Sequence, residues 1–309
     1  LALRMLHAWE ADAAGMTLNR PWTPAIDGTD AVWPDPLLGV FTNVARHLAG
    51  RRVVGRLPLR DGLQAMVLDG EGGGMIAAWS HGAPPDDAAL DLFLGPEPVV
   101  YDIWGNHAPV TMENRRHRVP LTETPVLIEG IDAELALFRA SFRVEPRFIE
   151  SKQTPHPREI VVRNPWTRTI NGHMQFTGPT GWDVQPAPHT FSLSPGQEMR
   201  LPVQMTFPFA ELAGEKELTA RFDFTADQHY VVDLAAPVEL GLTDLDYDVT
   251  LALHRTADPA RVDAELLCVL TNTGSTVKSL SLFAQLRTQA RQDRIIGSLQ
   301  PGQSIVRRF

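Results

Sequence analysis

Apolar residues along this chain of 309 residues recur with two spacings, and each spacing predicts a different kind of element. Intervals of three and four residues place apolar side chains on one face of a helix. That spacing, with Pro36 in the first turn of the second segment, predicts helices over residues 1–14 and 35–48. A third, short helix is expected over residues 132–141. A short strand is expected over residues 16–18.

The spacing between apolar residues shortens after residue 52, where short apolar stretches alternate with Gly, Pro and Asp. Such stretches, bounded by turn-forming residues, are typical of strands in antiparallel sheets. We expect strands over residues 53–59, 63–69, 74–80, 89–93, 99–103, 109–113, 117–121 and 125–129. The glycine-rich segment Gly70–Gly74 lacks the Lys and Ser/Thr of a phosphate-binding loop, so we interpret it as a hairpin loop.

A repeated pattern occupies the second half of the chain. Ile160–Asn164 is followed by Leu193–Gln197, and Leu267–Asn272 is followed by Leu299–Gln303. In both copies an aliphatic run ends at an Asn, and a later Pro-Gly turn opens another strand, as in antiparallel sandwiches. The pattern predicts tandem Ig-like β-sandwich modules.

The second copy of the pattern is shorter than the first. The first continues through expected strands over 199–207, 218–225 and 230–234, whereas the chain ends soon after Pro301. A sandwich without its last strands would leave an apolar edge open. We therefore expect a fragment, or a chain whose end is not represented, and Leu1 in place of an initiator Met points the same way.

Together these patterns predict a mainly β chain, in which an antiparallel β-sandwich with a small helical segment is followed by tandem Ig-like β-sandwich modules. Four divisions are expected: the helical segment 1–52, the antiparallel β-sandwich 53–141, an Ig-like module 142–241 and an incomplete second Ig-like module 242–309.

Charge and composition remove several classes of function. A formal net charge of −9 argues against binding to nucleic acid, which needs a basic surface. No apolar run approaches the roughly 18 residues of a membrane span. The single cysteine, Cys268, excludes an internal disulfide and a Cys-based zinc site, and we interpret it as a core residue. The ten histidines lack the spacing of metal ligands, so neither a metal nor a cofactor is expected.

Four segments, in their order, carry a resemblance to a known family: Leu37–Arg51, Ala77–Ser80, Tyr101–Asn106 and Thr124–Gly130. The series resembles the carboxy-terminal edge of a TIM-barrel glycoside hydrolase with its appended β-sandwich, as in the retaining families related to xylosidases and iduronidases. The resemblance covers residues 1–145 and implies that the helical segment 1–52 is a barrel edge. The first module resembles the Ig-like or fibronectin-like modules that follow such catalytic domains.

Retaining glycoside hydrolases need two carboxylates about 5 Å apart, and in a barrel these lie on earlier strands. The resemblance implies that both lie upstream of Leu1, so we assign no catalytic residue. The acids nearest the barrel edge are interpreted as solvated charges: Glu10, Asp12, Asp27 and Asp30. The implied function is that of a non-catalytic accessory region of a secreted or periplasmic glycoside hydrolase-like protein. It would brace an upstream catalytic domain or contact a polysaccharide or another glycan.

Tryptophans are the expected glycan contacts, because sugar rings stack on exposed aromatic faces. Trp22, Trp33 and Trp166 lie in Pro-rich loops, and Trp104 lies within the turn Asp102–Asn106. These four are the candidate carbohydrate-binding residues. The alternative interpretation of the three loop tryptophans is that their side chains fill a domain interface. For Trp104 the alternative is that Asp102 and Asn106 only set the turn and no ligand binds.

A structural or adhesion protein with Ig-like spacer modules is the alternative function. It predicts a self-contained first domain, whereas the glycoside hydrolase resemblance predicts that residues 1–50 pack as an orphaned strand–helix pair against the sandwich. An intact small hydrolase within the 309 residues is a third possibility, and it would need two facing carboxylates in one cleft.

Overall fold

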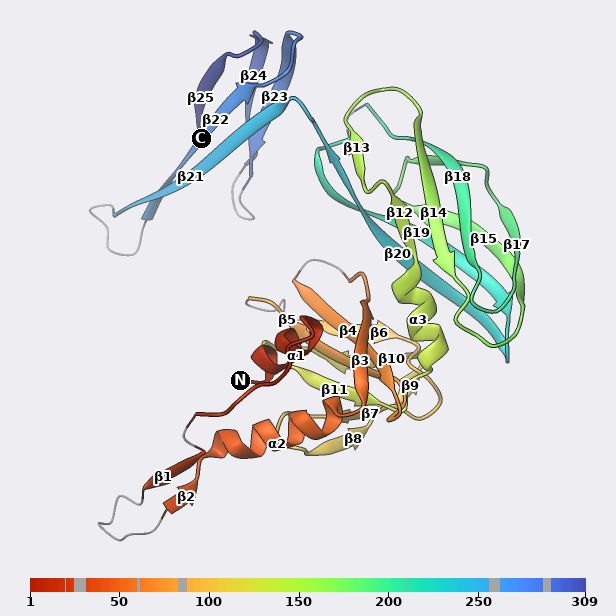
Figure 1. Cartoon of the computed structure of the whole chain (residues 1–309). Coiled ribbons are helices and arrows are strands. Elements are labelled where there is room, and N and C mark those ends of the chain that lie inside the picture. Colours follow the sequence, from red (N-terminus) through yellow and green to blue (C-terminus); the bar gives the residue numbers. More distant parts are fainter. Residues whose placement is uncertain are drawn as a thin grey trace. The chain divides into compact units, whose positions relative to one another are not determined.

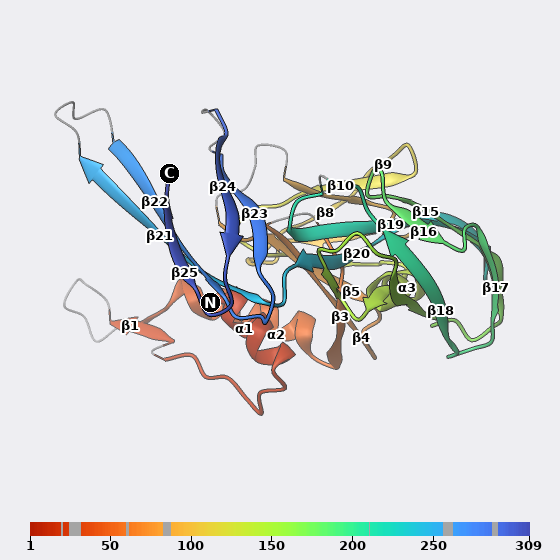
Figure 2. The same ribbon diagram turned by 90° about the horizontal axis from the view of Figure 1, so that it is seen from above.

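The computed structural model of the chain is mainly β, with several antiparallel sheets and three helices in the part described (Figure 1 and Figure 2). This confirms the predicted fold class.

Two compact units make up the chain: Leu1–Phe148, Gln153–Glu211 and Glu215–Glu239 form the first, and Ile149–Lys152, Leu212–Gly214 and Leu240–Phe309 form the second. The structure describes residues 1–19, 21–24, 32–59, 62–82, 88–209, 211–255, 262–285 and 290–309. The finer division into four parts stays a prediction.

The predicted helices are confirmed as α1 (Ala2–Glu10), α2 (Pro36–Leu48) and α3 (Ala133–Ser141). An Asp caps each of the last two: Asp35 accepts from the Leu37 N–H at 2.8 Å, and Asp132 accepts from the Leu135 N–H at 2.9 Å. Helix α1 ends at Glu10, earlier than predicted, because the residues after it are exposed and no packing extends it. No described helix is long and apolar enough to span a membrane.

Two sheets follow the first two helices. A six-stranded sheet has the order β3-β4-β5-β11-β7-β8, and a three-stranded sheet has the order β6-β10-β9. Their strands are β3 (Arg51–Arg56), β4 (Leu63–Gly70), β5 (Met75–Ser80), β6 (Ala89–Leu92), β7 (Val99–Tyr101), β8 (His107–Pro109), β9 (Met112–Glu113), β10 (Arg116–Pro120) and β11 (Val126–Glu129). The Gly70–Gly74 segment forms the β4–β5 hairpin loop, as predicted.

The single strand predicted over 109–113 is wrong. Strand β8 pairs with β7, whereas β9 pairs with β10 in the other sheet. The chain crosses between layers here and then reverses at Asn114 and Arg115, which have φ of 50° and 63°. Alternation of apolar residues does not show where a strand changes partner. The strand expected over 16–18 is also absent from the structure.

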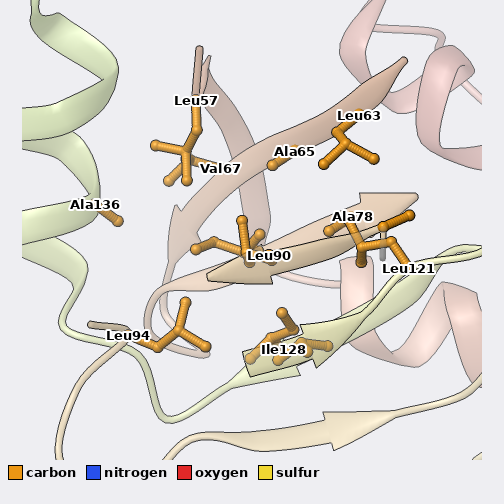
Figure 3. Packing of buried hydrophobic residues seen from close by; sticks show 13 residues of the cluster. Leu57, Leu63, Ala65, Val67, Ala78, Leu90, Leu94, Leu121, Ile128 and Ala136 are labelled. Carbon is orange, nitrogen blue, oxygen red and sulfur yellow. The ribbon is translucent and has the colours of Figure 1, made fainter. Parts of the chain in front are cut away.

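The central strands β4 and β5 of the six-stranded sheet are buried on both faces. Helices α1 and α2 cover one face through Leu6, Val44 and Leu48, which pack against Met66 and Met75. The three-stranded sheet and α3 cover the other face. Figure 3 shows this second cluster, which contains Leu57, Ala65, Val67, Leu90, Ile128 and Ala136. Helices α1 and α2 therefore close one face of a three-layer arrangement of helices and sheets.

The first Ig-like module is a sandwich of two sheets, in the orders β12-β14-β18-β16 and β13-β20-β19-β15-β17. Its strands are β12 (Arg143–Glu145), β13 (Phe148–Glu150), β14 (His156–Arg163), β15 (Ile170–Gly178), β16 (Asp183–Gln185), β17 (His189–Leu193), β18 (Glu198–Thr206), β19 (Gly214–Thr225) and β20 (His229–Gly241). Strands β12, β14 and β18 correspond to A, B and E of an Ig-like domain, and β15, β19 and β20 correspond to C, F and G.

The second unit repeats only part of this arrangement. One sheet has the order β21-β22-β25 and the other contains β23 and β24. The strands are β21 (Leu245–Arg255), β22 (Val262–Asn272), β23 (Lys278–Ala284), β24 (Gln292–Leu299) and β25 (Ser304–Arg308). Cys268 is buried between the sheets, as predicted. Among the described residues, strands F and G have no counterpart in this unit.

A buried Asn explains the repeated sequence pattern. At the end of β14, the Asn164 amide donates to the carbonyl oxygens of Arg168, Leu193 and Ser194 at 2.9, 2.8 and 3.1 Å. Its side-chain oxygen accepts from the Trp166 N–H at 2.9 Å. Because β14 and β17 lie in different sheets, this one side chain joins the two layers.

Asn272 forms the same clamp at the end of β22. Its amide donates to the carbonyl oxygens of Thr276 and Leu299 at 2.7 and 2.8 Å, and its oxygen accepts from the Gly274 N–H at 3.0 Å. Both Asn side chains are fully buried. The Pro-Gly turn lies beside each clamp, where Gly196 and Gly302 donate to the carbonyl of the respective Asn.

Replacing the clamp residue destabilises its module. We expect Asn164→Ala to lower the free energy of unfolding by about 2–4 kcal/mol, because buried carbonyl groups lose their donor. Urea denaturation followed by circular dichroism measures the change. Asn171→Ala is the matched control, since Asn171 is exposed on β15. An equal loss in both variants would contradict the clamp's role.

Candidate carbohydrate-contact site

Trp22 and Trp33 lie on a two-stranded ribbon ahead of α2. Strand β1 (Trp22–Pro24) pairs with β2 (Val32–Pro34), with Trp22 opposite Pro34 and Trp33 opposite Thr23. The two Trp side chains are 53% and 63% exposed. Because neighbouring positions of a strand point to opposite faces, the two rings project from opposite faces of the ribbon and cannot form one flat platform.

Trp104 lies on a tight turn after β7 and is 56% exposed. Asp102 accepts from the backbone N–H groups of Trp104 and Asn106 at 2.8 and 2.9 Å, and from the Asn106 side chain at 2.7 Å. Burial alone would raise the pKa of Asp102, but these hydrogen bonds outweigh it and lower the pKa from its ordinary value of 3.8. The carboxylate therefore holds the turn in its charged form.

Asn43 on α2 joins this turn to the helix. Its amide donates to the carbonyl oxygens of Asp102 and Ile103 at 3.2 and 3.4 Å. Gly105 has φ of 92°, and a Cβ there would lie 3.0 Å from the Asn43 side-chain oxygen. A glycine is thus needed for both the turn and the close approach of the helix.

An open groove of about 540 Å³ lies along α2, and none of the candidate tryptophans belongs to its lining. Its lining includes Pro34, which directly follows Trp33, and Asn43, which holds the turn of Trp104. Its polar lining residues include Thr42 and Arg46, which can exchange hydrogen bonds with hydroxyl groups. Contact of Trp22, Trp33 and Trp104 with a glycan stays a prediction.

Trp166 has a different environment from the other three candidates. It is 4% exposed, and its ring lies 5.4 to 5.5 Å from those of Phe138, Phe224 and Tyr230. Since side chains cover the ring, a sugar would have to displace part of the module core to reach it. The sequence context, a loop after a strand, does not distinguish an exposed Trp from one that plugs the end of a sandwich.

Of the acids near the first helices, Glu10 makes a structural contact and is not simply solvated. Glu10 pairs with Arg56 at 2.6 Å, and the hydrogen bond from Arg56 lowers the pKa of Glu10. A carboxylate held in its charged form suits an ion pair and not a general acid. Asp12 is exposed in the turn after α1. Asp27 and Asp30 lie outside the described residues. No group of three or more metal-ligating side chains occurs among the residues described.

A buried polar cluster at the end of α2 was not foreseen from the sequence. Glu129 accepts from His47 and pairs with Arg51, each at 2.9 Å. Arg51 also donates to the carbonyl groups of His47, Gly72 and Gly73. A Cβ at Gly72 would lie 2.9 Å from the Arg51 guanidinium, so the glycine-rich loop wraps this side chain. The spacing of four residues between His47 and Arg51 was the sequence signal that could have indicated this cluster. The cluster fixes the end of α2 to the sheet.

Comparison with known proteins gives neither a family model nor a curated protein that matches the chain. Solved structures that it resembles include a PapD-like domain of human CEP192, with 6% identity, 32% of this chain and 84% of that chain covered, and a TM-score of 0.23. The Salmonella enterica SafA pilin–SafB chaperone complex has 12% identity, coverage of 54% and 82%, and a TM-score of 0.25. The secreted serine protease VesC of Vibrio cholerae has 9% identity, coverage of 81% and 56%, and a TM-score of 0.26. At these scores, the Ig-like assignment rests on the strand order and pairing described above.

Acid should loosen the Trp104 turn. Because the folded pKa of Asp102 lies below 3.8, the turn gains stability above that pH and loses it as the pH falls through the folded pKa. We expect the amide resonance of Trp104 to shift below pH 3.8 in ¹H–¹⁵N spectra. Asp102→Asn should abolish this pH-dependent shift of the Trp104 resonance. A shift centred above pH 3.8 would contradict its assignment to the Asp102 carboxylate.

Proposed function

We propose that the chain is a structural, non-catalytic part of a multidomain protein, in which Ig-like modules act as spacers. The observation that carries this proposal is that α3 belongs to two hydrophobic cores at once. A helix shared by two domains removes the freedom of a linker. A spacer of this kind sets the distance and the orientation of whatever it joins.

One side of α3 packs in the first domain and the other in the first module. Ala136 belongs to the cluster of the six-stranded and three-stranded sheets. Phe138 is fully buried, and its ring lies 5.5, 5.4 and 4.9 Å from those of Trp166, Phe222 and Phe224. Trp166 thus serves as a plug at the end of the module.

Polar contacts fix α3 from both sides as well. Asp132, which caps the helix, also accepts from the Tyr230 hydroxyl of the module at 2.8 Å. Arg139 donates to the Phe93 carbonyl of the first domain at 2.6 Å. Burial lowers the pKa of Arg139 to about 10, so the side chain stays charged at neutral pH and its hydrogen bond is charge-assisted.

Distance measurement between spin labels tests the spacer. Labels at Glu123→Cys and Glu217→Cys, both exposed positions, report on the first domain and the module in a Cys268→Ala background. Double electron–electron resonance should give one narrow distance distribution. Phe138→Ala should broaden it, because a cavity at the joint loosens both cores, and should lower the free energy of unfolding by about 3–5 kcal/mol.

Phe209→Ala is the matched control, since Phe209 is 89% exposed and its loss should leave the distribution narrow. A broad distribution in the parent protein would mean that the two domains move independently. That outcome would contradict the spacer, whatever the variants do.

A second candidate function is the accessory region of a secreted or periplasmic glycoside hydrolase-like protein. The exposed rings of Trp33 and Trp104 favour it, together with the groove on α2, whose lining includes Pro34 beside Trp33 and Asn43, which binds the turn of Trp104. Here the upstream catalytic domain and a glycan would be the partners, and the rigid α3 joint would brace the catalytic domain. The family resemblance of residues 1–145 supports the same candidate.

A glycan array tests the second candidate. We expect a bound glycan to lose about fivefold or more in affinity with Trp104→Ala or Trp33→Ala, since each stacked ring contributes about 1 kcal/mol or more. Phe209→Ala removes an exposed aromatic ring elsewhere and should leave affinity unchanged. Binding to no glycan, or equal binding by all variants, would count against contact at this groove.

A further inference from the structure

The buried hydroxyl of Tyr230, on β20, contacts two carboxylates. It lies 2.8 Å from an oxygen of Asp132 at the start of α3, and 2.9 Å from an oxygen of Asp227 in the turn between β19 and β20. The side-chain amide of Gln228 donates to the same hydroxyl oxygen at 3.1 Å. The Tyr230 side chain is packed in the module, with its ring stacked 5.2 Å from that of Phe224. These contacts therefore meet at a hydroxyl whose position is fixed.

One hydroxyl hydrogen cannot serve both carboxylates well. An ionised carboxylate only accepts hydrogen bonds, and a tyrosine hydroxyl has one hydrogen to donate. Burial raises the pKa of Tyr230 above its ordinary value of 10.0, so the hydroxyl keeps that hydrogen at neutral pH. A bent hydrogen bond is weak, so a hydrogen placed between Asp132 and Asp227 would bond poorly to each. The two carboxylates therefore compete for Tyr230.

The two competing carboxylates have different surroundings. Asp132 is partly buried, and its other oxygen accepts from the Leu135 N–H at 2.9 Å as the cap of α3. The positive charge of the buried Arg139 also acts on Asp132. Asp227 is exposed, and no basic side chain in the described part of the chain pairs with it. Water can thus replace the hydroxyl at Asp227 more readily than at Asp132.

We propose that the Tyr230 hydroxyl is a switch, which alternates between Asp132 on α3 and Asp227 in the turn. Bonded to Asp132, the hydroxyl ties the module to the start of α3. Bonded to Asp227, it joins only two parts of the module, and the polar contact with α3 is lost. Removing the Asp227 carboxylate commits the hydroxyl to Asp132 and tightens the joint. The switch rests on the proposed function, because it acts on the same α3 joint.

Hydrogen exchange of the Leu135 amide, followed by ¹H–¹⁵N NMR of the full chain, tests the switch. This amide donates to Asp132, so its exchange reports opening of the first turn of α3. Asp227→Ala should slow the exchange by about two- to tenfold, because Asp132 gains a full hydrogen bond from the hydroxyl. Tyr230→Phe should accelerate the exchange by a similar factor, because the hydroxyl is lost.

A double variant separates competition for the hydroxyl from a general effect of charge. In the Tyr230→Phe background no hydroxyl is left to compete for, so adding Asp227→Ala should leave the Leu135 exchange unchanged. Asp233→Ala is the matched control in the parent protein. Asp233 lies on β20 like Tyr230, but it pairs with Arg221 at 3.0 Å on the exposed face, so its loss should not change the exchange.

Three outcomes would overturn the proposal. Faster exchange in Asp227→Ala would mean that the contact in the turn supports α3. Equal exchange in Asp227→Ala and the parent would mean that the hydroxyl never leaves Asp132. Slower exchange that persists in the Tyr230→Phe background would assign the effect to the charge of Asp227 alone. A broad spin-label distribution in the parent would instead contradict the spacer, and the exchange ratios would still test the switch.

Discussion

A single buried side-chain amide joins the two sheets of each Ig-like module, and the module's packing depends on it. A buried polar group must find partners, and a clamp Asn finds carbonyl oxygens at the end of a strand in the opposite sheet. Asn164 and Asn272 do so in matching ways. With the layers tied at that point, the registers of the strands that leave it are set, and apolar alternation can fill the space between the sheets.

The same principle of shared burial connects the first module to the domain before it. Phe138 fills the end of the sandwich while Ala136, two residues earlier, lies in the other core. Each core would contain a void without α3, so each domain stabilises the position of the other. The shared helix therefore limits the movement of the two domains relative to each other.

The two modules share the clamp and differ in what covers their sheets. Strands β19 and β20 bury the inward face in the first module, whereas Tyr247 and Leu253 remain exposed in the second. The same position of the repeat is thus buried or exposed according to which strands pack over it.

The sequence by itself determined the elements and the repeat. Helical spacing, with Pro36 in the first turn of α2, predicted the first two helices, and Gly, Pro and Asp between apolar runs predicted most strands. The sequence did not determine that β8 and β9 lie in different sheets, nor that Trp166 is buried. The candidate Trp residues had similar local sequence contexts. Local propensity and alternation act within a segment, whereas exposure depends on which distant segments pack over it. Only the tertiary structure could decide that Trp166 plugs a core while Trp33 and Trp104 meet solvent.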